Sequence, residues 1–169
     1  MMIIIHTAQL PEGFEPAPRI TEADEKNIIQ TTQRKLQDRL YLTIRPNEET
    51  GWSLPITTLN EDNDDETFVD GVKRYMKANK MLKNLSVRCL SNCPMVVDVI
   101  RYENGSEESD NGTYYGEKIF YMRVQYEEGD VKKVDKGIND WGWLERSEMV
   151  ERVKEEKGEE ASKFYHYML

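Results

Sequence analysis

The stretch that decides the fold covers residues 65–76 and reads DETFVDGVKRYM. Its apolar residues recur at the spacing of an α-helix: Phe68, Val69, Val72 and Met76. This spacing predicts a helix over residues 66–80 that packs on a sheet through Phe68, Val72 and Met76. Asp65 precedes the run and is predicted to cap the first turn.

The segments on either side of this helix have the patterns of strands. Apolar and polar residues alternate over residues 40–45, which predicts a half-buried strand, and Trp52-Ser53-Leu54-Pro55 predicts a short second one. Downstream, segments rich in β-branched and aromatic residues predict strands at 85–90, 94–102, 118–126 and 141–144. A run of Gly and Asn over 103–113 predicts that the strands before and after it form a long hairpin.

Helices are predicted at both ends of the chain. Thr21 and Asp24 match a capping box, which predicts a polar helix over 21–39. Near the other end, Ser147 is predicted to cap a helix that ends at Gly158, and residues 159–169 to form a last helix. The last helix carries aromatic and apolar residues on one side: Phe164, Tyr165 and Met168.

This order of elements predicts an α/β or α+β sandwich with a mixed β-sheet between helices. Three regions are predicted: an extended arm over residues 1–20, the helix over 21–39, and one domain over 40–169. The arm is rich in proline, and so few of its residues are apolar that we expect it to become ordered only against a partner, with docking centred on residues 16–20.

The composition narrows the classes of partner. The formal net charge is −9, which disfavours a dedicated nucleic-acid binder because phosphate contacts need clustered Lys and Arg. No apolar run is long enough to cross a membrane. We therefore expect protein partners, limited contact with RNA and no membrane association.

The run at 65–76 resembles the centre of a Nudix box, the strand–loop–helix signature G-x5-E-x7-R-E-U-x-E-E-x-G. The spacing from Glu66 to Arg74 matches that signature. Two further stretches resemble family landmarks in the same order, one at 52–55 leading into the box and one at 143–149 leading into the terminal helix. The resemblance implies a Nudix-like fold from about residue 40 to about residue 150.

The chain departs from the signature where Nudix hydrolases hold magnesium. Tyr75 replaces the Glu after the arginine, and Ala78 and Asn79 replace the two metal-binding glutamates. The leading and trailing glycines are Asn60 and Met81. Because Mg²⁺ needs carboxylate oxygens, the resemblance implies that the chain is not an enzyme. It implies no catalytic, cofactor-binding or metal-binding residues, no cofactor and no small-molecule substrate.

The N-terminal region narrows the resemblance further. Pro18-Arg19-Ile20-Thr21, an acidic helix and a strand that begins near Leu40 stand directly ahead of the degenerate box. This order is similar to a Nudix-fold family of the mitochondrial large ribosomal subunit, the one numbered forty-six in that series. The resemblance implies a structural role in the central protuberance of that subunit, with other large-subunit ribosomal proteins as partners. It implies a mitochondrial location, although no recognisable transit peptide is seen at the start of this sequence.

Two alternatives remain open. One is a magnesium-dependent Nudix hydrolase of nucleoside diphosphate derivatives that uses Glu61, Asp64 or Glu66 as substitute ligands. The other is a nucleotide-binding module that does not cleave, for which only scattered residues offer stacking or positive charge: Trp52, Arg45 and Lys118. The simpler interpretation makes 61–66 a solvated acidic loop and gives Glu66 and Arg74 structural roles.

Overall fold

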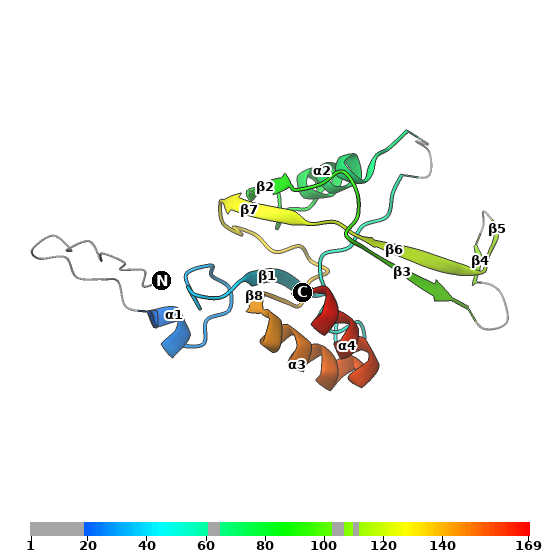
Figure 1. Ribbon diagram of the computed structural model, residues 1–169. Coiled ribbons are helices and arrows are strands. Elements are labelled where there is room, and N and C mark those ends of the chain that lie inside the picture. Colours follow the sequence, from blue (N-terminus) through cyan, green and yellow to red (C-terminus); the bar gives the residue numbers. More distant parts are fainter. Residues whose placement is uncertain (1–18, 61–64, 103–106, 110–111) are drawn as a thin grey trace, which may run out of the picture.

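The computed structural model describes residues 19–60, 65–102, 107–109 and 112–169 (Figure 1). The predicted arm at 1–20 lies almost wholly outside these residues, as do Glu61 and Asp64. Among the described residues, no helix is both long enough and apolar enough to cross a bilayer.

The centre of the fold is a ladder of two antiparallel strands that are far apart in sequence. Strand β1 (Leu40–Arg45) pairs with β8 (Asp140–Glu145), so that Leu42 lies opposite Trp143 and Thr43 opposite Gly142. Successive side chains of a strand point to opposite faces. Trp143 and Leu144 therefore enter two different apolar clusters, and both faces of this ladder are covered. The strand predicted at 40–45 is confirmed, but it is more buried than its alternation indicated.

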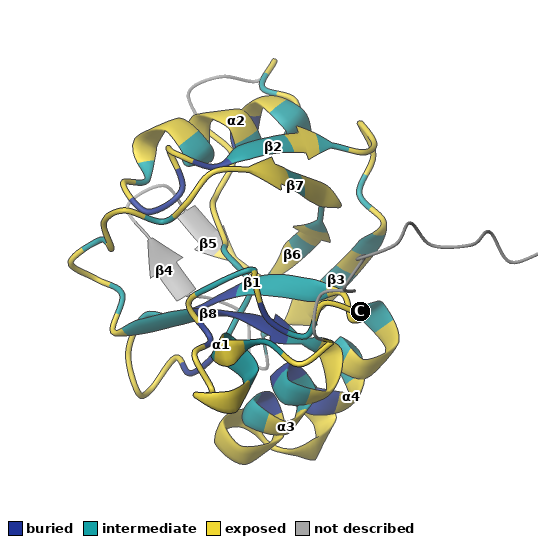
Figure 2. Ribbon diagram, turned by 90° about the vertical axis from the view of Figure 1, so that its left-hand side faces the viewer, coloured by how far each residue is buried: buried dark blue, intermediate teal, exposed yellow. Residues whose placement is uncertain are grey.

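Two helices cover one face of the ladder. They are α3 (Arg146–Lys157) and α4 (Glu159–Met168), which lie side by side beneath β1 and β8 (Figures 1 and 2). Met149 and Val153 of α3 are fully buried against Leu144 and Trp52. Gly158 ends α3 as predicted. Its φ of 89° lies outside the helical region, and glycine adopts such a positive φ without steric cost.

The other face of the ladder carries the helix predicted from residues 65–76. Helix α2 (Phe68–Ala78) lies beyond a second antiparallel ladder of β2 (Ser86–Cys89) and β7 (Val124–Glu128) (Figure 2). Between this layer and the central ladder lies an apolar cluster whose buried members are Ile44, Met81, Leu82, Leu85 and Trp143. Phe68, Val72 and Met76 are each half-buried, in agreement with the predicted inner face.

The predicted hairpin is present but extends differently. Strand β3 (Val96–Arg101) pairs antiparallel with β6 (Gly116–Tyr121), and the short β4 (Glu107–Ser109) and β5 (Gly112–Tyr114) pair with each other between them. The single strand predicted at 118–126 is wrong, because β6 ends at Tyr121 and β7 begins at Val124. This break lets β6 and β7 pair with two different partners.

The predicted mixed sheet is also wrong for the described residues. Their strands form four two-stranded ladders, and all four are antiparallel. The strand predicted at 52–55 is reduced to one bridge between Ser53 and Ile44. The mixture of helices and small antiparallel sheets makes the class α+β.

The helix predicted over 21–39 is wrong in its length. Helix α1 covers only Glu22–Glu25, although the predicted capping box is present, with Asp24 N–H donating to Thr21 Oγ1 at 3.2 Å. Asn27 and Lys35 take positive φ values of 50° and 40°, which a helix does not allow. The segment instead follows the central ladder, where the Ile29 carbonyl accepts from Trp143 N–H at 2.8 Å. Tertiary contacts thus override the local helical pattern.

Two predicted caps are replaced by neighbouring residues. Thr67, not Asp65, caps α2, and its Oγ1 accepts from Asp70 N–H at 3.2 Å. The N-cap of α3 is Glu145, not Ser147, and Glu145 N–H donates to the Glu148 carboxylate at 3.0 Å. Both helices were predicted correctly, but each predicted cap lies two residues from the residue that caps the helix.

Candidate functional site

The two residues that match the Nudix signature form an ion pair. Arg74 Nε lies 2.7 Å from Glu66 Oε1, and the other Glu66 oxygen accepts from Asn60 N–H at 2.6 Å. Arg74 also donates to the Thr58 carbonyl at 2.6 Å. The Arg74 guanidinium is the main reason that the pKa of Glu66 is below its usual range. The pair therefore fastens the chain ahead of α2 to the helix, and the Glu66 oxygens are already engaged.

The three positions where the signature has carboxylates have other uses. Tyr75 is half-buried against the cluster of Trp143, and burial raises the pKa of its hydroxyl. The Asn79 side chain accepts from the N–H groups of Met81 and Leu82 at 3.0 and 3.3 Å. Ala78 is exposed. Tyr75 and Asn79 thus support packing at the end of α2 and offer no anionic metal ligand.

The described part of the chain holds no group of three or more His, Cys, Asp or Glu residues arranged to bind a metal ion. Of the proposed substitute ligands, Glu61 and Asp64 lie outside the described residues, and Glu66 is held by Arg74. Nothing in the described residues therefore assembles a metal site around Glu66.

The scattered nucleotide-binding candidates do not form a pocket together. Arg45 and Trp52 both contact Glu156 of α3. Arg45 Nη2 lies 2.7 Å from one carboxylate oxygen, and the backbone N–H of Trp52 donates to the other at 2.7 Å. The Trp52 ring is buried, with the Arg152 guanidinium 4.8 Å from its centre, so it is not open to stack on a base. Lys118 lies on β6, on a different ladder.

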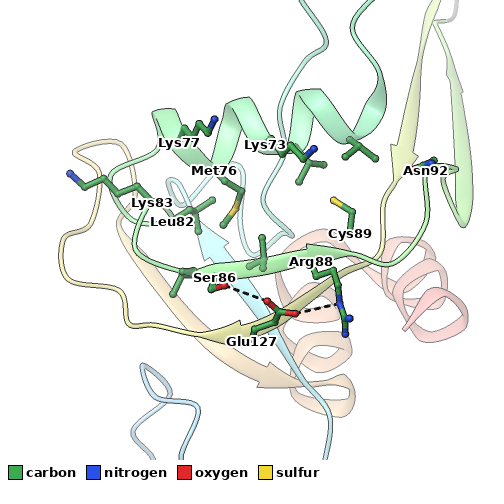
Figure 3. Close-up of a pocket in the computed structure, with 14 residues that line it drawn as sticks. Lys73, Met76, Lys77, Leu82, Lys83, Ser86, Arg88, Cys89, Asn92 and Glu127 are labelled. Atoms are coloured by element: carbon green, nitrogen blue, oxygen red, sulfur yellow. Dashed lines mark hydrogen bonds and ion pairs between the residues drawn. The ribbon is translucent and has the colours of Figure 1, made fainter.

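A groove that the sequence did not predict lies between α2 and β2 (Figure 3). Its volume is about 610 Å³, and its sides carry four cationic residues, Lys73, Lys77, Lys83 and Arg88. Arg88 is neutralised by Glu127 at 3.3 Å. The three lysines are exposed, and within the described residues none forms an ion pair. The groove therefore concentrates positive charge on a chain whose net charge is −9.

The lysines of this groove were not recognisable as a group in the sequence. Lys73 and Lys77 share one face of α2 because they are four residues apart, and that much could be predicted. Lys83 follows the helix after a turn, and its place at the groove depends on the burial of Met81 and Leu82.

No family model matches the chain. Two curated relatives that it resembles are proteins of a large ribosomal subunit. Both are named Large ribosomal subunit protein mL46. The chain is 27% identical over 149 residues to the protein from Neurospora crassa, which is 84% of this chain and 39% of that one. It is 25% identical over 136 residues to the protein from Schizosaccharomyces pombe, which is 80% of this chain and 44% of that one. The chain thus matches about two fifths of the length of these relatives.

Proposed function

We propose that the chain is a structural component of the large subunit of the mitochondrial ribosome. The observation that carries this proposal is the similarity to mL46 proteins of two fungi over 80% or more of the chain. A role in assembly and architecture, in the region of the central protuberance, follows from the resemblance that the N-terminal region and the degenerate box carry.

The arrangement of layers supports a Nudix-like sandwich for residues 40–169 as part of this proposal. The central ladder and the β2–β7 ladder lie between α2 on one side and α3 with α4 on the other (Figures 1 and 2). Helix α2 carries the residues that resemble the Nudix signature, but Tyr75 and Asn79 serve packing and Glu66 serves an ion pair. Because the positions where the signature has metal ligands serve packing here, we favour a domain that has the Nudix-like scaffold without hydrolase activity.

The partners in this proposal are mainly other large-subunit proteins. A net charge of −9 opposes the approach of the chain to RNA, because the phosphates carry charge of the same sign. We therefore infer that contact with rRNA is limited. From the similarity to mL46 proteins we infer that no small molecule is a substrate and that the protein acts in the mitochondrion.

Sedimentation tests the proposal. The affinity-tagged protein is expressed in its native cell, and mitochondrial lysates are separated on sucrose gradients at high and at low magnesium. The protein is expected to move with intact ribosomes at high magnesium and with large subunits alone after dissociation. A tagged small-subunit ribosomal protein is the control. Sedimentation of the tagged protein at the top of both gradients, apart from any ribosomal particle, contradicts the proposal.

A further inference from the structure

The groove between α2 and β2 combines positive sides with an apolar floor. Val69, Val72 and Met76 of α2 form the floor with Val87 of β2, and all four are half-buried. Figure 3 shows the Met76 side chain pointing from α2 into the space above β2, with Lys73 and Lys77 on the same helix and Lys83 at one end. A partner that fits must therefore offer both apolar side chains and negative charge.

The combination of lysines and an apolar floor favours a peptide ligand over a nucleic acid. No aromatic side chain is among the described residues that line the groove, so a base has nothing on which to stack. Phosphates bound by the lysines would leave the Val and Met floor facing a polar backbone. An acidic segment of a protein satisfies both parts, because its carboxylates reach the lysines while its apolar side chains cover the floor.

We propose that the groove is a docking site for an acidic segment of a protein partner, with apolar side chains between its Asp and Glu residues. Lys73 and Lys77, one helical turn apart, flank the segment on the side of α2, and Lys83 binds its end. Only the origin of the segment, a neighbouring protein of the large subunit, rests on the proposed function. Binding itself belongs to the isolated protein and is tested without the ribosome.

The test uses fluorescence polarisation with the full chain. The probe is a fluorescein-labelled peptide of repeated Glu-Glu-Leu. A peptide with Gln in place of every Glu and a labelled oligouridylate are compared with it. The Glu peptide is expected to bind, with an affinity that falls as salt is raised, and the other two to bind at least about tenfold more weakly.

Charge reversal locates the site. Lys73→Glu with Lys77→Glu is expected to weaken binding of the acidic peptide by about tenfold or more, because two attractions become repulsions. The matched control, Lys118→Glu with Lys163→Glu, makes the same change in net charge at exposed positions outside the groove and is expected to leave affinity nearly unchanged. If the α2 variant does not fold, as judged by circular dichroism, Lys83→Glu with Lys77→Gln is used with the same expectation.

Three outcomes overturn the proposal. They are failure of the unaltered protein to bind the peptide, preference for the oligouridylate, and an equal loss of affinity in the variant and the control.

Discussion

Arg34 and Glu148 are joined by two parallel hydrogen bonds, from Nη1 to Oε2 at 2.8 Å and from Nη2 to Oε1 at 2.7 Å. Arg34 is 2% exposed, and its Nη1 also donates to the Trp143 carbonyl at 2.9 Å. Lys35 adds a contact to the same carboxylate at 3.1 Å. These bonds fasten the irregular segment after α1 to β8 and to the first turn of α3.

Removing the charge of Glu148 should therefore destabilise the fold. Glu148→Gln leaves the buried Arg34 guanidinium without its counter-charge, and the expected loss is about 2 kcal/mol in the free energy of unfolding. This is less than for a fully buried pair, because the Glu148 side chain is 20% exposed. Urea denaturation measures the loss. Glu151→Gln, exposed on the same helix, is the control, and an equal loss in the two variants would contradict the role of the pair.

The same pair predicts a pH dependence. Burial opposes ionisation of Glu148, but hydrogen bonds from Arg34, Glu145 N–H and Lys35 outweigh it and lower the pKa of Glu148 from 4.5 to about 2. A carboxyl whose pKa is lower in the folded state stabilises that state above its unfolded pKa, and loses this effect as pH falls towards the folded pKa. The stability difference between the wild type and Glu148→Gln should be constant above about pH 5 and shrink below about pH 4.5. A difference that is independent of pH contradicts this reasoning.

Asn79 should matter through the helix end, not through a metal. Asn79→Ala removes an acceptor from the N–H groups of Met81 and Leu82, which are 0% and 2% exposed. The Met81 N–H keeps the Asp135 carboxylate at 3.2 Å, and the expected loss is about 1 kcal/mol. Ala78→Ser changes the neighbouring exposed residue and should cost less than about 0.5 kcal/mol. Thermal unfolding with and without magnesium checks both expectations. Stabilisation of the wild type by magnesium that is lost in Asn79→Ala would instead indicate a metal ligand.

Gly142 lies where β8 passes close to Ile29. A Cβ added at Gly142 would come within 2.8 Å of the Ile29 side chain, so Gly142→Ala should destabilise the protein by about 1–3 kcal/mol. At Gly137 an added Cβ meets nothing within 4 Å, which makes Gly137→Ala the control. Adding Ile29→Val to Gly142→Ala should recover part of the loss in a urea titration. An equal effect of the two glycine variants would argue against this contact.

Hydrolysis should be absent. Isothermal titration calorimetry and chromatography for released nucleoside monophosphate, with magnesium and a panel of nucleoside diphosphate derivatives, are expected to show neither binding nor turnover, because Glu66 is paired with Arg74 and Tyr75 packs inward. An active Nudix hydrolase is the positive control. Turnover that disappears in Glu66→Gln would replace the structural account with an enzymatic one.

The sequence predicted the elements whose pattern and packing agree. The helix at 66–80, the strand at 40–45 and the last helix were confirmed because their apolar spacing matches the face that each buries. The helix predicted over 21–39 was wrong for the opposite reason. Ile29 and Arg34 bind residues of β8 and α3, and local spacing in the sequence does not reveal these contacts. The break between β6 and β7 depends on pairing with separate partners and was equally hidden.

Of the candidate site, two local relationships could be predicted. Glu66 and Arg74 are eight residues apart on one short loop and helix, and Lys73 and Lys77 are four residues apart on the helix. The basic groove needed the turn after α2 to bring Lys83 to the face of Lys73 and Lys77. The composition also gives no sign of the groove, because the positive charge of three lysines is outweighed by the acidic residues that give a net charge of −9.

The most direct test of the central claim is a cryo-electron microscopy map of the mitochondrial large subunit purified from cells that express the chain. The account predicts density that fits the central ladder with α2 and with α3 and α4, and a larger area buried against ribosomal proteins than against rRNA. Absence of the chain from the particle, or rRNA contributing most of its contact surface, would contradict the account.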